Sequence, residues 1–186
     1  MDPGVKIREA RPADAEAIAR VRVETWRTTY RGIIPDAFLD ALSIPEKTDR
    51  YRQSLEDKGS KKFHFVAESG GKVVAFATGA PERTGNREYT GELDGVYVLE
   101  AFQGRGVGRC LVRAVVTRLA REGHRAMLVR VLAANPWRRF YETLKGIPLT
   151  DQNLKVAHVF SGVDCPVAIY GWKDLGAVAK CAEKAS

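Results

Sequence analysis

The chain has 186 residues, of which 45% are hydrophobic and 28% are charged. These values are typical of one soluble globular domain whose core needs no disulfides or metals. The net formal charge is +7, but the Lys and Arg residues are scattered along the chain, which argues against a nucleic-acid partner. We predict a single domain over residues 1–175 and a short C-terminal tail over residues 176–186.

The compartment is predicted from two features of the sequence. Residues 1–19 are interrupted by charged residues and a proline, so they indicate neither a signal peptide nor a membrane span. The three cysteines, Cys110, Cys165 and Cys181, are odd in number and lack CxxC spacing. We therefore expect a reduced, cytoplasmic protein with no structural metal and no membrane contact.

The first half of the chain predicts one strand, three helices and a hairpin. Alternation and helical spacing place a strand at 5–10, a helix at 13–30, a short helix at 35–42, a helix at 43–56, and hairpin strands at 63–67 and 72–78. The polar residues that follow, 80–91, predict a loop.

The second half predicts further alternation of strands and helices. The expected elements are a strand at 93–99, a helix at 108–122, a buried strand at 126–132, a short helix beginning at Asn135, and strands near 153–160 and 167–172. Residues beyond Leu175 are rich in alanine and are expected to fray. The sequence therefore predicts a mixed α/β domain.

The most informative stretch is the turn Gln103–Gly108, with sequence QGRGVG, between a predicted strand and a predicted helix. A glycine-rich turn of this kind gathers backbone N–H groups at the positive end of the helix dipole, where phosphate binds. Two common phosphate motifs fit poorly. A P-loop needs Lys followed by Ser or Thr, and here Arg109 and Cys110 follow the last glycine. A dinucleotide fingerprint needs G-x-G-x-x-G and a later acid, and here the glycines alternate and the next strand ends without an acid.

A third pattern, Q/R-x-x-G-x-G/A, is filled by Gln103, Gly106 and Gly108, and with it the sequence resembles the GNAT family of N-acetyltransferases. The flanking strand and helix, Asn135 and residues 140–144 extend the resemblance. It implies the GNAT acyltransferase fold: a mixed, mostly antiparallel twisted sheet of six to seven strands, flanked by helices and splayed between its two central parallel strands.

The resemblance implies acetyl-coenzyme A as cosubstrate, bound between those two strands, and no metal. The turn backbone would hold the pyrophosphate, and the strand backbone would pair with the pantetheine arm, with Val98 N–H steadying an oxyanion. Asn135 resembles the family residue that binds the pantetheine amides, although it is also suited to a simple N-cap. The implied cofactor-binding residues are Val96, Tyr97, Val98, Gln103, Gly104, Arg105, Gly106, Val107, Gly108, Arg109, Asn135 and Tyr141.

The same resemblance implies two catalytic groups. Glu92 begins the strand beside the cofactor and would take a proton from the amine, either after burial or through water. Asp94 is the alternative acid on the same face. Tyr141 matches the family tyrosine that protonates the departing thiolate, although its place on an apolar helix face equally suits a core aromatic.

The acceptor is predicted only as a primary amine of a small molecule or peptide. Candidate lining residues are Trp26, Tyr30, Phe38, Asp94 and Tyr170. Family members commonly have Leu-Gly-Phe after the tyrosine helix, whereas this chain has Leu144 followed by Lys-Gly-Ile-Pro. A homodimer is compatible with the sequence. A non-catalytic acetyl-CoA sensor remains the alternative function, against which the presence of both Glu92 and Tyr141 argues.

Overall fold

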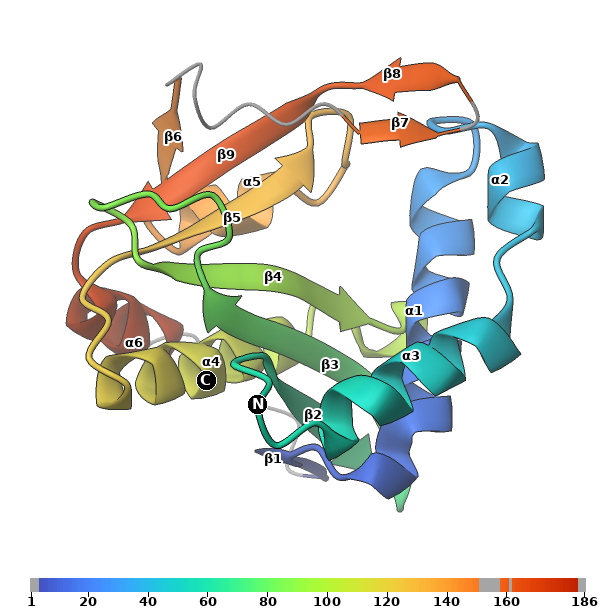
Figure 1. The fold of residues 1–186 in the computed structure, drawn as a ribbon, viewed down its shortest axis with the longest axis horizontal. Coiled ribbons are helices and arrows are strands. Elements are labelled where there is room, and N and C mark those ends of the chain that lie inside the picture. Colours follow the sequence, from blue (N-terminus) through green and yellow to red (C-terminus); the bar gives the residue numbers. More distant parts are fainter. Residues whose placement is uncertain (1–3, 151–157, 161, 184–186) are drawn as a thin grey trace.

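A seven-stranded sheet forms the centre of the computed structural model, which describes residues 4–150, 158–160 and 162–183 (Figure 1). The strand order is β1-β2-β3-β4-β5-β9-β6, and within it only the pairing of β4 with β5 is parallel. The strands are β1 (Val5–Glu9), β2 (Phe63–Ser69), β3 (Lys72–Pro81), β4 (Gly91–Val98), β5 (Met127–Leu132), β6 (Ile147–Leu149) and β9 (Val167–Trp172). Two further strands, β7 (His158–Phe160) and β8 (Val163–Cys165), pair with each other.

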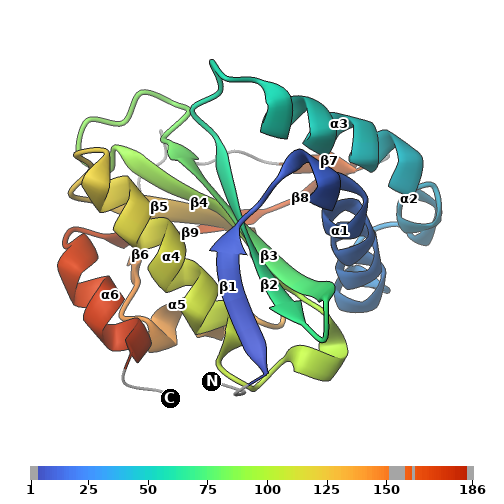
Figure 2. The same cartoon turned by 90° about the horizontal axis from the view of Figure 1, so that it is seen from below.

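Helices cover both faces of the sheet (Figure 2). One face carries α1 (Ala15–Tyr30) and α3 (Ile44–Glu56), and the other carries α4 (Val107–Arg121) and α6 (Leu175–Glu183). Short helices α2 (Asp36–Asp40) and α5 (Arg139–Thr143) complete the set, with single 3₁₀ turns at Pro12–Asp14 and Glu100–Phe102. Within the described ranges, no helix has the length and apolar character needed to cross a bilayer.

Helix α4 is fixed to the sheet by its apolar face. Leu111, Val115 and Leu119 repeat at helical spacing and are fully buried against the strands. Burial of each such side chain contributes about 1.5–3 kcal/mol. This packing sets the position of the N-terminal end of α4, which begins directly after the glycine-rich turn.

Strand β4 bends and leaves its parallel partner. Thr78 of β3 pairs with Gly95 and Gly79 pairs with Leu93, so Asp94 is an extra residue in β4. Such a bulge bends a strand and increases its twist. The pairing of β4 with β5 covers only residues 91–93, although both strands continue beyond it. The sheet is therefore splayed at its centre, as the family resemblance implied.

The fold prediction is confirmed: the sheet is mixed, mostly antiparallel and flanked by helices. The expected fraying beyond Leu175 is wrong, because residues 175–183 form α6. Leu175, Val178 and Ala182 share one helical face and are buried with the residues of α4. The alanine content concealed this apolar spacing.

The C-terminal strands differ in detail from the prediction. Of the strand expected at 153–160, residues 153–157 lie outside the described residues, and residues 158–160 form β7. Strand β6 was not anticipated, because Pro148 lies within it, and proline disfavours a strand interior. It pairs with β9 at the edge of the sheet, where a missing N–H is tolerated.

Candidate functional site

A cavity of about 560 Å³ lies at the point where β4 and β5 separate. Its walls come from α1, β4, the glycine-rich turn, the start of α4, the end of β5 and the segment around α5. Residues far apart in the sequence therefore meet at the split in the sheet.

The turn between β4 and α4 requires glycine at two positions. Gly104 and Gly106 have φ angles of 70° and 79°, in the left-handed region that other residues adopt at a cost. At Gly108 a Cβ would lie 3.4 Å from the Phe140 ring, an ordinary van der Waals contact, so space does not require glycine there. Gln103 Nε2 donates to the Val98 carbonyl at 2.9 Å, which ties the turn to β4. The first N–H groups of the 15-residue helix α4 thus border the cavity without helical partners.

The end of β4 presents backbone groups to the split. Leu99 N donates to the Val74 carbonyl on β3 at 3.0 Å, so this amide points away from β5. Because successive amides of a strand point to opposite sides, Val98 N–H and Val96 N–H point toward β5, which has already diverged. Both residues line the cavity. An extended molecule carrying amides can therefore pair with this edge as a strand would.

Tyr141 and Asn135 form the opposite wall. Burial raises the pKa of Tyr141, so its hydroxyl stays protonated at neutral pH. Within the described part of the chain, this hydroxyl has no hydrogen-bond partner. Asn135 Oδ1 accepts from the Trp137 amide at 2.8 Å, and its Nδ2 donates to Tyr30 Oη at 2.7 Å. Asn135 thus acts as a local cap and also joins α1 to this wall.

A buried ion-pair network lies beside the cavity, where Arg83, Asp94 and Arg130 belong to the lining. The Arg130 side chain, 1% exposed, reaches Glu82 Oε1 at 2.5 Å and Glu92 Oε1 at 3.0 Å. Arg83 Nη2 lies 2.7 Å from Glu92 Oε1, and Arg83 Nη1 lies 3.6 Å from Asp94 Oδ1. Arg83 and Arg130 thus link the carboxylates of Glu82, Glu92 and Asp94. Removing one partner of a buried ion pair leaves an uncompensated charge, which is strongly destabilising.

The two glutamates of this network have opposite pKa shifts. Burial opposes ionisation of Glu82, but hydrogen bonds from Thr84, Arg130 and backbone amides lower its pKa to about 2. Burial raises the pKa of Glu92, and the attraction of Arg83 and Arg130 only partly offsets it. Glu92 is therefore a better proton acceptor than an exposed glutamate.

The structure brings most of the predicted site residues to one cavity. Those that line it are Trp26, Tyr30, Asp94, Val96, Tyr97, Val98, Gln103, Gly104, Gly106, Val107, Gly108, Arg109, Asn135 and Tyr141. Glu92 is 2% exposed and lies behind the lining. Phe38 packs on Phe160, and Tyr170 donates a hydrogen bond to the exposed Glu142; neither Phe38 nor Tyr170 lines the cavity. The Arg105 guanidinium lies over the Phe102 ring, outside the lining.

Sequence reasoning missed three arginines that the structure places at the site. Arg22, Arg83 and Arg130 all line the cavity. The sequence holds a signal for two of them, since Arg130 interrupts an apolar strand and Arg22 lies between two buried valines, four residues before Trp26. A charge in such a place requires a partner or a function. Arg83 lies in a polar loop and carries no comparable signal.

Comparison with known proteins identifies one family consistently. The model of the acetyltransferase (GNAT) family matches residues 23–146. The uncharacterised N-acetyltransferase YuaI of Bacillus subtilis is 35% identical over 175 residues, which cover 94% of this chain and 96% of YuaI.

Two solved structures share the fold. The N-acetyltransferase PaiA of Thermoplasma acidophilum, in complex with coenzyme A, has a TM-score of 0.67 at 16% identity and covers 90% of this chain and 99% of its own. YncA of Salmonella typhimurium, with its cofactor acetyl-CoA, also has a TM-score of 0.67, at 21% identity. The match covers 91% of this chain and 94% of the YncA chain.

The buried network gives a stability prediction. Arg130→Leu leaves Glu82 and Glu92 buried without their shared partner, and we expect the free energy of unfolding to fall by about 3–5 kcal/mol. Arg83→Gln is the matched control: Arg83 is half exposed and Glu92 keeps Arg130, so we expect a loss below about 1 kcal/mol. Urea denaturation followed by circular dichroism measures both. Equal losses would show that the network does not depend on Arg130.

Proposed function

The chain belongs to the acetyltransferase (GNAT) family, and from that membership we propose that it transfers the acetyl group of acetyl-CoA to a primary amine by direct attack in a ternary complex. The observation that carries the proposal is the unpaired edge of β4 at Val96 and Val98, beside the N-terminus of α4. The backbone amides of Val96 and Val98, which suit the extended pantetheine arm, and the first amides of α4, which suit the phosphates, border the same cavity.

Acetyl-CoA supplies a thioester carbonyl that an amine can attack. The residues present fit this molecule: Gly104 and Gly106, both in the left-handed region, leave the backbone of the turn open to a ligand. Val98 N–H points into the split, where a donor can stabilise charge on a carbonyl oxygen. Helix α4 gives this end of the cavity a positive potential that suits pyrophosphate.

The amine must lose a proton, because a free alkylamine with a pKa of about 10.4 is protonated at neutral pH. We assign this role to Glu92, whose pKa burial raises, acting through one water because its carboxylate lies behind the cavity lining. Asp94 lines the cavity and would hold the incoming ammonium. Arg83 forms ion pairs with both carboxylates and so holds Glu92 and Asp94 in position relative to each other.

The departing thiolate needs a proton, and Tyr141 is placed to donate it. Its ring lines the cavity. Burial raises the pKa of Tyr141, so the hydroxyl is protonated when the thiolate leaves and can donate a hydrogen bond, and with it the proton, to the sulfur. Together these groups provide a base, an oxyanion donor and an acid for amide formation.

We expect coenzyme A to stabilise the protein and the turn backbone to control its affinity. Gly106→Ala places a Cβ at a φ of 79°, which costs about 1–2 kcal/mol and reorients amides at the start of α4. Gly70→Ala, at a φ of 54° in the β2–β3 turn, carries a similar backbone penalty far from the cavity.

Thermal unfolding with and without coenzyme A separates the two effects. Both variants should melt at lower temperature, while only Gly106→Ala should lose about tenfold or more in coenzyme A affinity. If the wild-type protein shows no shift at millimolar coenzyme A, the proposed function is wrong.

The acid role gives a kinetic prediction. Tyr141→Phe removes the hydroxyl and keeps the ring, so we expect kcat to fall by about 10²-fold or more with the acetyl-CoA KM nearly unchanged. Tyr170→Phe is the control, since the Tyr170 hydroxyl donates to the exposed Glu142 and lies outside the cavity lining. If Tyr141→Phe has the same kcat as Tyr170→Phe, Tyr141 is not the acid.

The base role predicts a change in the pH profile. A base must be ionised, so kcat/KM should fall as the pH drops through the raised pKa of Glu92. Glu92→Gln should lower kcat/KM by about 10²-fold at neutral pH and abolish this acidic limb. Asp94→Asn should instead raise the amine KM and leave the limb in place. If Asp94→Asn abolishes the acidic limb and Glu92→Gln leaves it in place, Asp94 is the base.

A further inference from the structure

A second cavity of about 250 Å³ opens beside the first, between α1, α3 and the sheet. The two cavities share Arg22, Asp94 and Tyr97 in their walls, so they meet at the acceptor end of the site. The glycine-rich turn lines only the first cavity. The phosphates of coenzyme A would therefore lie at the opposite end.

The second cavity has a surplus of positive charge. Its lining includes four basic residues, Arg22, Lys47, Arg50 and Lys62, and one acid, Asp94. Lys62 Nζ lies 3.2 Å from Asp94 Oδ2, so these two charges neutralise each other. Among the residues that the structure describes, no carboxylate lies within ion-pair distance of the remaining three cations.

Arg22 is fixed at the junction of the two cavities. Its guanidinium carbon lies 4.4 Å from the centre of the Trp26 ring and 4.5 Å from that of Tyr97, and it donates a hydrogen bond to Tyr97 Oη. Stacking occupies the faces of the guanidinium and leaves its in-plane N–H donors directed sideways. A guanidinium held in this way is suited to bind a carboxylate or phosphate through paired hydrogen bonds.

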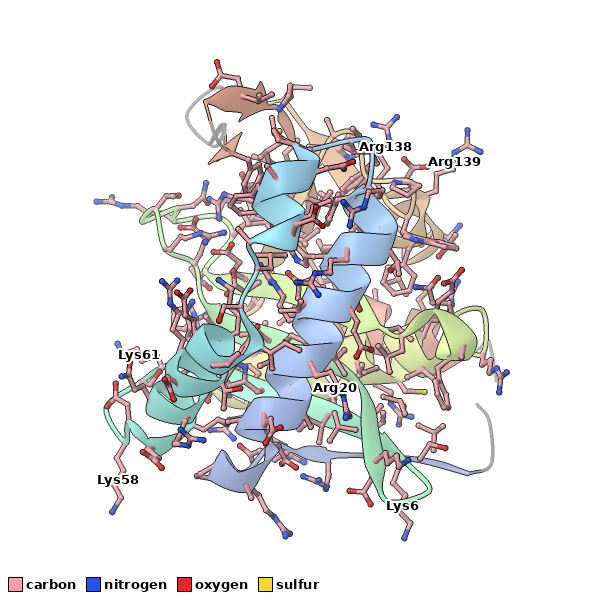
Figure 3. All side chains as sticks on the ribbon, turned by 90° about the vertical axis from the view of Figure 1, so that its right-hand side faces the viewer. Lys6, Arg20, Lys58, Lys61, Arg138 and Arg139 are labelled. Atoms are coloured by element: carbon pink, nitrogen blue, oxygen red, sulfur yellow. The ribbon has the colours of Figure 1, made fainter. Side chains whose placement is uncertain are left out.

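Helix α3 supplies the other two cations. Lys47 is half-buried, and burial, with Arg50 and Arg22 nearby, lowers its pKa. By contrast, Figure 3 shows Lys58 and Lys61 extending into solvent beyond the end of this helix. Arg22 and Lys47 therefore differ from the ordinary basic surface, because they retain positive charge in partial burial without a carboxylate partner, and a bound anion would relieve that cost.

We propose that the acceptor is a small zwitterionic amine, one that carries a carboxylate or phosphate a few bonds from its amino group. The amine would lie beside Asp94 in the first cavity, and the anionic group would lie beside Arg22, Lys47 and Arg50 in the second. This inference rests on the proposed function and specifies its substrate class. Diamines and polyamines fit poorly, since a second ammonium would face the three cations.

Matched amines test the charge directly. With acetyl-CoA and purified protein, acetylation of β-alanine is compared with that of β-alaninamide, and acetylation of phosphoethanolamine with that of ethanolamine. Each pair differs mainly in the anionic group, so we expect kcat/KM to be at least tenfold higher for a charged member. The pair with the larger ratio identifies carboxylate or phosphate as the natural group. Putrescine serves as the dication.

Two surface variants locate the effect. Lys47→Gln combined with Arg50→Gln should raise the KM for the preferred anionic amine about tenfold or more and leave the acetyl-CoA KM unchanged. Its KM for the neutral partner should not change. Arg52→Gln is the matched control on α3: Arg52 is exposed, pairs with Asp49 and lies outside the second cavity. It should match the wild-type protein for every amine.

The outcomes separate this inference from the proposed function. Equal or faster acetylation of neutral amines or putrescine would overturn the zwitterion, while acetyl transfer itself would stand. An unchanged KM in the double variant would also overturn it. Failure of coenzyme A to bind would instead remove the proposed function, on which the inference rests.

Discussion

The structure depends on the early separation of two parallel strands. Strands β4 and β5 pair only over residues 91–93, and the bulge at Asp94 then turns β4 away. Backbone groups inside a protein must be paired or solvated, so the free edge at Val96 and Val98 is costly unless a ligand or water meets it. This free edge lies along the first cavity, where a ligand or water can reach it. The glycine-rich turn, Tyr141 and helix α1 then become the walls of a site whose central element is unpaired backbone.

Charge in the acceptor half is arranged in two layers. The buried layer, in which Arg130 joins Glu82 to Glu92, consists of ion pairs in direct contact and holds the loop after β3 against β5. The outer layer, at Arg22, Lys47 and Arg50, is unbalanced and borders the second cavity. Paired charges supply a rigid frame, and an excess of cations supplies attraction for an anion. The carboxylate that we propose as the base belongs to the first layer, and the selection of the acceptor that we propose belongs to the second.

The sequence was informative wherever chemistry is local. Alternating glycines and the spacing of Leu111, Val115 and Leu119 predicted the turn and the helix, and the family resemblance implied a place for Tyr141 at the site. Features that arise from pairing between distant segments were out of reach. The bulge at Asp94 is a property of its register with β3, and the burial of Glu92 depends on Arg83 and Arg130 from other elements. Helix α6 was not predicted, because the high alanine content drew attention away from the helical spacing of its buried apolar residues.

This division explains why the cofactor can be read from the sequence and the acceptor cannot. The phosphate contacts that we propose use the backbone of the turn, so a few contiguous residues carry that prediction. Recognition of an acceptor needs side chains from α1, α3 and β4, and each of them alone resembles an ordinary surface or core residue. Arg22 illustrates this. In the sequence of α1 it resembles any surface arginine, and only its position against the Trp26 and Tyr97 rings holds its guanidinium where we propose that an anion binds. Specificity in this fold is therefore a property of packing, which a family motif does not record.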